Sequence, residues 1–288
     1  MPCPISGRNA TLNDGQFLSP AGPTALLLVF AAIAGCRTGR NYASSEGPRY
    51  AGEAHQEGSG GPVATDTLRM ASFNIEFSLE VDRAITVLGS DPALRRADVL
   101  LLQEMNQRAT EQIARALDLG YVYYPAFFHF RTGQDVGNAV LSRWPIVDDR
   151  KIVLPHVSRF VRTQRTATAA TIQVGRMLVR VYSTHLGTMG DLAPAARRDQ
   201  LRAILDDAEH YPRVVIGGDM NDATVGQVAR AMGYAWPTER GPETTRLGRL
   251  DHIFFKGLGV PDSAAAGTVL DAGGASDHRP VWAVGILR

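Results

Sequence analysis

The chain has 288 residues, of which 44% are hydrophobic and 20% charged, so its length predicts one or two globular domains. The formal net charge of +1 gives neither a broad basic face for a nucleic-acid backbone nor an acidic tail. Both cysteines, Cys3 and Cys36, lie near the N-terminus, which excludes a disulfide and a thiolate metal site from the rest of the chain.

Residues 1–36 are predicted to be a signal peptide of the lipoprotein type. Residues 25–34 form an apolar run that is well below the roughly 20 residues needed to span a bilayer and fits the core of a secretory signal. The run ends in Ile33-Ala34-Gly35-Cys36, which resembles the lipobox of bacterial lipoproteins. The resemblance implies that Cys36 is lipidated and that the protein lies in a bacterial cell envelope, either lipid-anchored or secreted into the periplasm. A buried apolar segment and an uncleaved anchor are the alternatives.

Residues 37–65 are predicted to be a flexible linker. They are rich in Gly, Ser, Ala, Pro and charged residues, and Gly58-Ser59-Gly60-Gly61-Pro62 is typical of a tether. The folded domain is therefore expected to span residues 66–288.

Strand and helix patterns alternate through this domain, which is typical of an α/β fold. In chain order, they predict a strand at 68–75, a helix at 79–88, a strand at 98–104, a helix at 110–117, strands at 121–130 and 137–143, a hairpin of 166–174 with 177–184, a helix at 194–210, a strand at 213–216, a short helix at 225–232, and strands at 251–255 and 279–286.

The strand at 213–216 is followed by Gly217-Gly218-Asp219-Met220-Asn221. Glycine permits a sharp turn and lets another group come close to the backbone. The strand therefore delivers a carboxylate and an amide into an open crevice, where they can hold a metal or orient a water. The alternative is that Asp219 or Asn221 caps the next helix.

Polar residues recur where apolar strands begin or end. Burying a charge without a partner is costly, so such residues are expected to gather at one edge of the sheets. The set consists of Asn74, Glu104, His185, Asp219, Asn221, Asp251, Asp277 and His278. Together, these carboxylates, amides and imidazoles predict a hydrolytic site.

The chain from about Leu68 onward resembles the endonuclease/exonuclease/phosphatase superfamily, which includes deoxyribonucleases, repair nucleases, neutral sphingomyelinases and inositol-polyphosphate phosphatases. The motifs that carry the resemblance are Ser72-Phe73-Asn74, Leu102-Gln103-Glu104, Ser183-Thr184-His185-Leu186, Gly218-Asp219-Met220-Asn221, Leu250-Asp251-His252-Ile253 and Ser276-Asp277-His278-Arg279-Pro280. The resemblance implies a four-layer α/β sandwich of two mixed β-sheets flanked by helices. It also implies hydrolysis of a phosphoester with Mg²⁺ or Mn²⁺.

The resemblance further implies a role for each motif residue. Asp219 would orient or deprotonate the attacking water, and Asn221 would hold that water or the phosphate. His278, oriented by Asp251, would contact the phosphate, and His185 would act on the leaving group. Metal ligation falls to Glu104, with Asn74 and Asp277.

The family also places an arginine near the phosphate and a tyrosine in the segment that follows the Glu104 motif. Arg165 matches the arginine. The tyrosine stays open among Tyr121, Tyr123 and Tyr124.

The expected activity is hydrolysis of a phosphodiester, with a nucleic acid or a phospholipid as substrate, by a monomer tethered to a membrane through its lipid anchor. From residue 66 onward basic and acidic residues almost balance, which argues mildly against a strong binder of duplex DNA. Against a lipid substrate, the sequence shows no exposed apolar hairpin. The alternatives are a phosphomonoesterase and a catalytically silent binding or scaffold lipoprotein of the same fold.

Overall fold

The structure is a computed structural model, and it describes residues 40–54, 65–261 and 265–287. The chain divides into two units, Met1–Arg37 and Thr38–Arg288, and all described residues belong to the second. The predicted signal peptide and Cys36 therefore lie outside the described residues.

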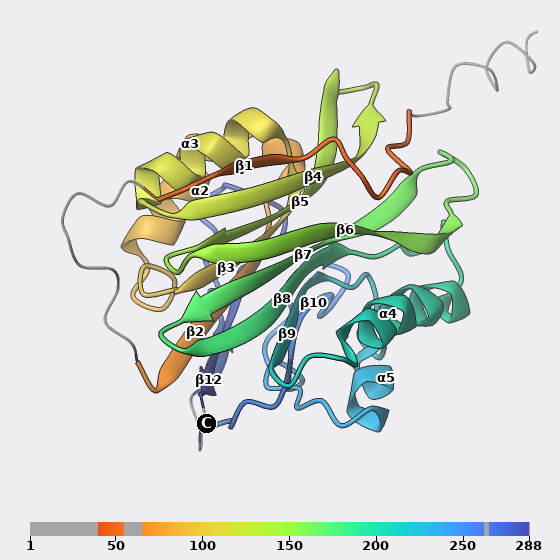
Figure 1. Ribbon diagram of the computed structural model, residues 1–288. Coiled ribbons are helices and arrows are strands. Elements are labelled where there is room, and N and C mark those ends of the chain that lie inside the picture. Colours follow the sequence, from red (N-terminus) through yellow and green to blue (C-terminus); the bar gives the residue numbers. More distant parts are fainter. Residues whose placement is uncertain (1–39, 55–64, 262–264, 288) are drawn as a thin grey trace, which may run out of the picture. The chain divides into compact units, whose positions relative to one another are not determined.

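The second unit is built on two mixed β-sheets (Figure 1). The larger sheet has the strand order β1-β4-β5-β3-β2-β12-β11 and the smaller sheet β10-β9-β8-β7-β6. The larger sheet consists of β1 (Tyr50–Gly52), β2 (Thr67–Asn74), β3 (Val99–Met105), β4 (Gly120–His129), β5 (Gln134–Ser142), β11 (Ala266–Thr268) and β12 (Val281–Ile286). The smaller sheet consists of β6 (Ile146–Val157), β7 (Gln164–Val174), β8 (Met177–His185), β9 (Val214–Asp219) and β10 (Asp251–Lys256).

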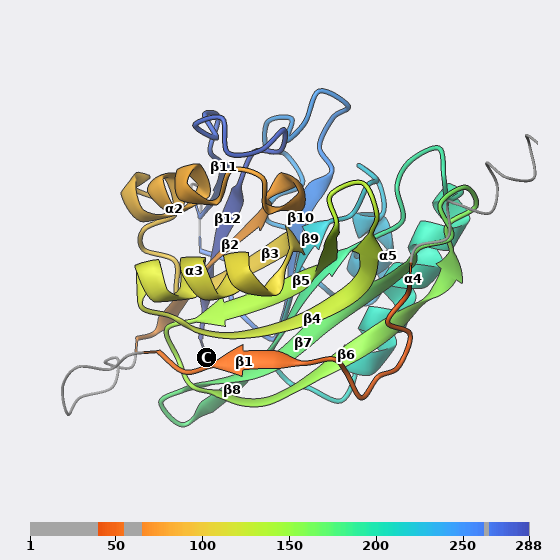
Figure 2. The ribbon, with the colours of Figure 1, turned by 90° about the horizontal axis from the view of Figure 1, so that it is seen from above.

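Helices cover the outer face of each sheet (Figures 1 and 2). On the larger sheet these are α2 (Val81–Ser90) and α3 (Gln107–Leu117), and a short 3-10 turn, η1 (Glu76–Ser78), precedes α2. On the smaller sheet they are α4 (Pro194–Ala208) and α5 (Gly226–Ala231). The predicted four-layer α/β sandwich is confirmed.

Three apolar clusters hold the layers together. Leu101 of β3 and Val215 of β9 belong to the cluster between the sheets, and both are fully buried. Ile113 of α3 belongs to a second cluster under the larger sheet's helices, and Ile204 of α4 to a third under the smaller sheet's helices. Burial on this scale is the main favourable contribution to folding.

Two parallel strand pairs determine where the polar strand ends meet. β2 runs parallel to β3, and β8 runs parallel to β9, while every other pairing is antiparallel. The carboxyl ends of β2, β3, β8 and β9 thus bring Asn74, Glu104, His185 and Asp219 together. β10 runs antiparallel to β9, so Asp251 at its start pairs with Asp219 at the end of β9.

The two glycines before Asp219 are required by close packing. A Cβ on Gly217 would lie 2.6 Å from Leu101 Cδ1, and one on Gly218 would lie 1.8 Å from the carbonyl oxygen of Thr184. The side-chain-free backbone lets β9 approach β8 and the larger sheet, as the sequence predicted. The alternative that Asp219 or Asn221 caps the next helix is not seen, because α5 begins only at Gly226 and has no side-chain cap.

Strand β6 was not predicted from the sequence. It is an edge strand that pairs only with β7, and most of its residues are partly or fully exposed. A charged edge strand does not show the apolar pattern of a buried strand, so the hydrophobic pattern did not predict it. β11 is three residues long and was missed for a similar lack of pattern.

The prediction of a flexible linker is wrong for residues 40–54, which pack on the domain. β1 pairs antiparallel with β4, and the Tyr50 ring stacks on Tyr123 with centroids 6.0 Å apart. Arg49 forms an ion pair of 2.6 Å with Asp149. Tyr50 and Arg49 make these contacts within an otherwise polar segment, and two such residues are too few to be recognised from composition. The boundaries of the signal peptide and of the domain stay predictions.

Among residues 40–54, 65–261 and 265–287, no helix is both long enough and apolar enough to cross a membrane.

Candidate active site

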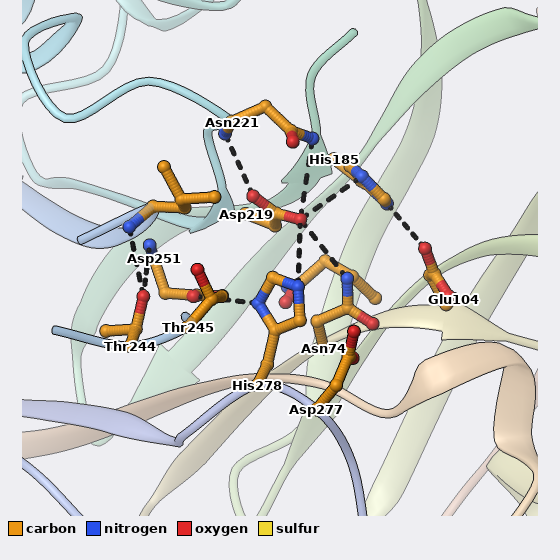
Figure 3. Close-up of polar contacts among 12 residues, drawn as sticks. Asn74, Glu104, His185, Asp219, Asn221, Thr244, Thr245, Asp251, Asp277 and His278 are labelled. Carbon is orange, nitrogen blue, oxygen red and sulfur yellow. Dashed lines mark hydrogen bonds and ion pairs between the residues drawn. The ribbon is translucent and has the colours of Figure 1, made fainter. Parts of the chain in front are cut away.

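The Asp219 carboxylate is the centre of the crevice (Figure 3). Its Oδ2 accepts a hydrogen bond of 3.2 Å from Asn74 Nδ2, and its Oδ1 accepts one of 2.9 Å from the backbone N–H of Asn221. The side chain is 2% exposed. Burial, with the nearby Asp251 charge, raises the pKa of Asp219 to about 7. A carboxylate with that pKa can accept a proton near neutral pH.

His278 is held as a cation by Asp251. Its Nδ1 lies 2.9 Å from Asp251 Oδ2, and its Nε2 lies 3.7 Å from Asp219 Oδ2. Burial alone would lower the pKa of His278, but the charge and hydrogen bond of Asp251 outweigh it and raise the pKa to about 10. The imidazole is therefore protonated at neutral pH.

The loop before β10 fixes the position of Asp251. The Thr244 hydroxyl accepts hydrogen bonds from the backbone N–H groups of Leu250 and Asp251, at 3.0 and 3.2 Å. Asp251 is buried, and its Oδ1 has no hydrogen-bond partner among the described residues.

His185 contacts Asp219 from the end of β8. Its Nε2 lies 3.2 Å from Asp219 Oδ2, and its Nδ1 lies 3.6 Å from Glu104 Oε1, which is too long for a hydrogen bond. Burial and the charge of Arg165 lower the pKa of His185 well below its usual value. His185 is therefore neutral, and its Nδ1 has no partner among the described residues.

Glu104 is directed into the crevice by an irregularity in β3. The pairing of β3 with β5 shifts register between Leu102 and Met105, and Glu104 adopts a positive φ of 57°. A bulge of this kind redirects a side chain, and a non-glycine residue in this region marks a functional constraint. Glu104 Oε2 accepts a hydrogen bond of 3.0 Å from Phe77 N–H, and burial raises the pKa of the carboxyl.

Asn221 also adopts a positive φ, of 49°. Its Nδ2 donates a hydrogen bond of 3.1 Å to the carbonyl of Leu186, just after His185. Asn221 therefore ties the loop after β9 to the loop after β8 and keeps its side chain beside Asp219.

Asp219, Asp251 and His278 form a group that could hold a metal. Among the described residues, they offer one ligand atom each, and these atoms lie within 4.8 Å of one another. The set differs from the predicted metal ligands Glu104, Asn74 and Asp277.

Two of the predicted metal ligands lie inside the crevice, and the third lies at its edge. Asn74 contacts Asp219, and a hydrogen bond with Asn74 lowers the pKa of Glu104 against the larger effect of burial. Asp277 is exposed, and its backbone N–H donates to Glu76 Oε2 at 3.2 Å. Figure 3 shows Asp277 below Asn74.

The sequence predicted a role in the site for Arg165 but not for Asn138. Arg165, a predicted phosphate ligand, lines a small cavity of about 10 Å³ with Glu104 and His185. Asn138 lines the same cavity and is buried, and its Oδ1 has no partner among the described residues. A strand-interior asparagine gives no sequence signal on its own, so Asn138 was missed.

Glu76 was missed as well. Its backbone N–H donates to Asn74 Oδ1 at 3.1 Å, and its carboxylate accepts from Asp277 N–H. Glu76 lies two residues after the Asn74 motif, in a turn with positive φ. Its proximity to a predicted metal ligand was the signal that could have identified it.

None of the three candidate tyrosines places its hydroxyl in this crevice. Tyr121 bonds Glu111 at 3.2 Å, Tyr124 bonds Asp149 at 2.6 Å, and the hydroxyl of buried Tyr123 has no partner among the described residues. The aromatic ring nearest Arg165 is that of Phe127, whose centroid lies 5.6 Å from the guanidinium carbon. The expectation of a site tyrosine in 121–124 is therefore wrong, because these side chains pack elsewhere on β4.

The sequence matches the model of the Endonuclease/Exonuclease/phosphatase family over residues 71–278. The chain belongs to this family, whose members are metal-dependent phosphoesterases. No curated protein matches the sequence.

Solved structures share the fold at low sequence identity. An endonuclease/exonuclease/phosphatase from Bacteroides vulgatus is 17% identical, with a TM-score of 0.62, and the match covers 78% of this chain and 100% of that one. D. rerio TDP2, solved with a single-strand DNA product, is 19% identical (TM-score 0.60; 77% and 99% covered). Sphingomyelinase C from Streptomyces griseocarneus is 18% identical (TM-score 0.55; 77% and 100% covered).

Proposed function

We propose that the protein is a divalent-metal-dependent phosphodiesterase that acts in the crevice around Asp219. The observation that carries the proposal is the buried Asp219 carboxylate, whose Oδ2 lies 3.2 Å from Nε2 of His185, 3.7 Å from Nε2 of His278 and 3.2 Å from Nδ2 of Asn74. Groups whose surroundings drive their pKa values apart define an acid and a base. Membership of the family supports the reaction class.

In the proposed reaction, Asp219 accepts the proton of the attacking water. Asn221 holds Asp219 through its backbone N–H and presents its amide to the water or the phosphate. The cationic His278 stabilises negative charge that grows on the phosphoryl oxygens. Arg165, which lines the same small cavity as Glu104, binds the phosphate. The P–O bond to the leaving group breaks beside His185, and the leaving oxygen departs as an anion that takes its proton from solvent, because neutral His185 has a single N–H and its Nε2 lies against Asp219.

Glu104, Asn74 and Asp277 are the proposed ligands of Mg²⁺ or Mn²⁺. Their donor atoms are carboxylate and amide oxygens, which hard divalent cations prefer. Asp219, Asp251 and His278 are the alternative group, and they offer two carboxylate oxygens and an imidazole nitrogen. A bound cation would neutralise charge on the phosphate.

The proposed substrate is a phosphodiester of a nucleic acid or of a phospholipid, met by a protein that is lipid-anchored through Cys36 in a cell envelope. Each substrate class is supported by one protein of the same fold. D. rerio TDP2 was solved with a single-strand DNA product, and the protein from Streptomyces griseocarneus is named a sphingomyelinase. A phosphomonoesterase and a silent scaffold are the competing functions. The complete set of acid, base and carboxylate groups in the crevice argues against a scaffold.

Hydrolysis of bis-p-nitrophenyl phosphate and of p-nitrophenyl phosphate by the full chain tests the proposal. The assay is run in Mg²⁺, in Mn²⁺ and in chelator. Metal-dependent turnover of the diester, faster than turnover of the monoester, supports a phosphodiesterase. A preference for the monoester would indicate a phosphomonoesterase, and absent turnover of both esters would favour the scaffold. Turnover that the chelator leaves unchanged would refute the dependence on a divalent metal.

A further inference from the structure

Residues 40–54, named here the N-terminal strap, are fastened to the domain along their length. The buried ammonium of Lys151 donates to the carbonyl oxygens of Tyr42 and Gly47, at 2.9 and 2.6 Å. The Tyr42 hydroxyl donates to Asp135 at 2.7 Å, and Arg49 pairs with Asp149. With the β1–β4 pairing, these contacts fix the place where the described chain begins.

That place lies between two loops. Phe128 N–H in the β4–β5 hairpin donates to the carbonyl of Arg40 at 2.7 Å. Asn41 donates to the Arg162 carbonyl and accepts from Gln164 N–H, both at 2.8 Å, in the connection between β6 and β7. Figure 1 shows the strap beginning between this hairpin and this connection.

The two loops carry exposed apolar side chains next to arginines. Phe130 in the hairpin is 58% exposed, and Phe160 and Val161 in the β6–β7 connection are 69% and 46% exposed. The adjacent arginines are all exposed. We name the whole set the rim, and it comprises Arg40, Phe130, Arg131, Arg159, Phe160, Val161 and Arg162. The sequence analysis did not identify these exposed apolar side chains.

The rim adjoins the crevice. Arg165 follows the β6–β7 connection directly and donates to Thr188 in the loop after His185, at 2.9 Å. Phe127, which forms a β-bridge with Asn41 beside the start of the strap, lines the same small cavity as Glu104 and His185. A surface that binds the rim thus lies next to the catalytic groups.

We propose that the rim docks on an anionic phospholipid bilayer and presents the crevice to a phosphodiester in a lipid head group. The inference rests on the proposed phosphodiesterase function and names its substrate class. Cys36 precedes Arg40 by four residues, which span at most roughly 14 Å of extended chain. A lipid on Cys36 would therefore hold Arg40, and the rim with it, close to the bilayer.

The chemistry of the rim fits a bilayer. Phenylalanine and valine side chains enter the boundary between head groups and acyl chains, and arginines pair with lipid phosphates. Exposed phenylalanines could also stack on the bases of a single-stranded nucleic acid. Valine has no stacking face, however, so the side chain of Val161 fits burial in a bilayer and not stacking on a base. The bilayer is the occupant that the short tether also favours.

The test uses the full chain with Cys36→Ser, so that binding does not depend on a lipid anchor. The rim variant replaces Phe130, Phe160 and Val161 with alanine. The matched control replaces Leu178, Met232 and Leu270, which are 51%, 40% and 62% exposed and lie outside the rim. Binding is measured by co-sedimentation with vesicles of phosphatidylcholine and phosphatidylglycerol at 3:1, and with single-stranded DNA by fluorescence anisotropy.

The proposal predicts that the rim variant loses vesicle binding by about tenfold or more, while the control keeps it and both retain turnover of bis-p-nitrophenyl phosphate. In a Phe160→Trp variant the added tryptophan should fluoresce at shorter wavelength when vesicles are present, and in Leu178→Trp it should not. Unchanged vesicle binding by the rim variant overturns the proposal, as does a rim-dependent affinity for DNA without one for vesicles.

The same experiment separates the two claims. If the protein binds vesicles through the rim but hydrolyses no ester, docking of the rim on a bilayer is supported and the phosphodiesterase function is refuted. Ester hydrolysis with rim-independent vesicle binding would do the reverse.

Discussion

His185 and His278 both contact Oδ2 of Asp219, but they reach it from different sheets and differ in charge. His185 ends β8 of the smaller sheet, is buried beside Arg165, and has a pKa well below the usual value. His278 precedes β12 of the larger sheet, pairs with Asp251 at 2.9 Å, and has a pKa of about 10. Burial lowers both pKa values, so the difference comes from the neighbouring charges: Arg165 lowers the pKa of His185 further, whereas Asp251, with Asp219 and Asp277, raises that of His278.

The comparison shows how one crevice can hold an acid and a base side by side. We call His278 with Asp251 the cationic half and His185 with Arg165 the neutral half. Asp219 contacts the histidine of each half, and its own pKa of about 7 depends on burial and on Asp251. Substitutions at Asp219, Asp251 and His185 test the halves separately.

The largest effect is expected for Asp219→Asn, which removes the proton acceptor shared by the two halves. Turnover of bis-p-nitrophenyl phosphate should fall by about 10³-fold, within the usual range for a catalytic base. Asp222→Asn is the control, because Asp222 lies in the same loop but contacts Arg197 and Thr224 instead of the histidines. Equal losses in the two variants would contradict a catalytic role for Asp219.

Asp251→Asn should convert the cationic half into a neutral one. Activity that needs protonated His278 is present below its pKa and lost above it. The alkaline limb of the kcat/KM profile should therefore move from about pH 10 in the wild type toward the ordinary histidine pKa of about 6.5. At pH 8 the loss should be about 30-fold, because that pH lies about 1.5 units above the ordinary histidine pKa. An unmoved alkaline limb would show that Asp251 does not control the charge of His278.

His185→Gln should have a smaller effect, about tenfold on kcat, because a neutral hydrogen-bonding group replaces a neutral imidazole. The alkaline limb should stay in place, since Asp251 and His278 are intact. Measured beside Asp251→Asn, a shift of that limb in His185→Gln would mean that the two histidines titrate as one unit.

The smallest effect is on stability and concerns only the cationic half. Folding raises the pKa of His278 from 6.5 to about 10, so the folded state binds its proton more tightly. This stabilisation is complete below pH 6.5 and is lost as the pH rises through 10. The difference in free energy of unfolding between the wild type and His278→Gln should therefore shrink steadily as the pH rises through that window. Denaturant titrations at several pH values measure it, and a constant difference would contradict the raised pKa.

The convergence of the motif residues could be predicted, because parallel strands end at the same edge and the polar residues stood at strand ends. Asn74, Glu104, His185 and Asp219 follow from this rule alone. The bulge that turns Glu104 inward could not be predicted, since it depends on the register between β3 and β5.

The strap and the rim could not be predicted for a related reason. The strap is held by contacts such as that between Tyr42 and Asp135, 93 positions apart in the chain, and no local pattern encodes them. The exposure of Phe130 and Phe160 could not be predicted either, because the sequence alone does not show which side of a loop faces solvent.

The most direct test of the account is a pH titration of the two histidines by NMR in the metal-free protein, with His185→Gln and His278→Gln used to assign the signals. The account predicts that the His278 imidazole titrates near pH 10, while His185 stays neutral throughout the range above pH 6.5. Titration of both rings together near pH 6.5 would contradict it, because the crevice would then hold no separate acid and base.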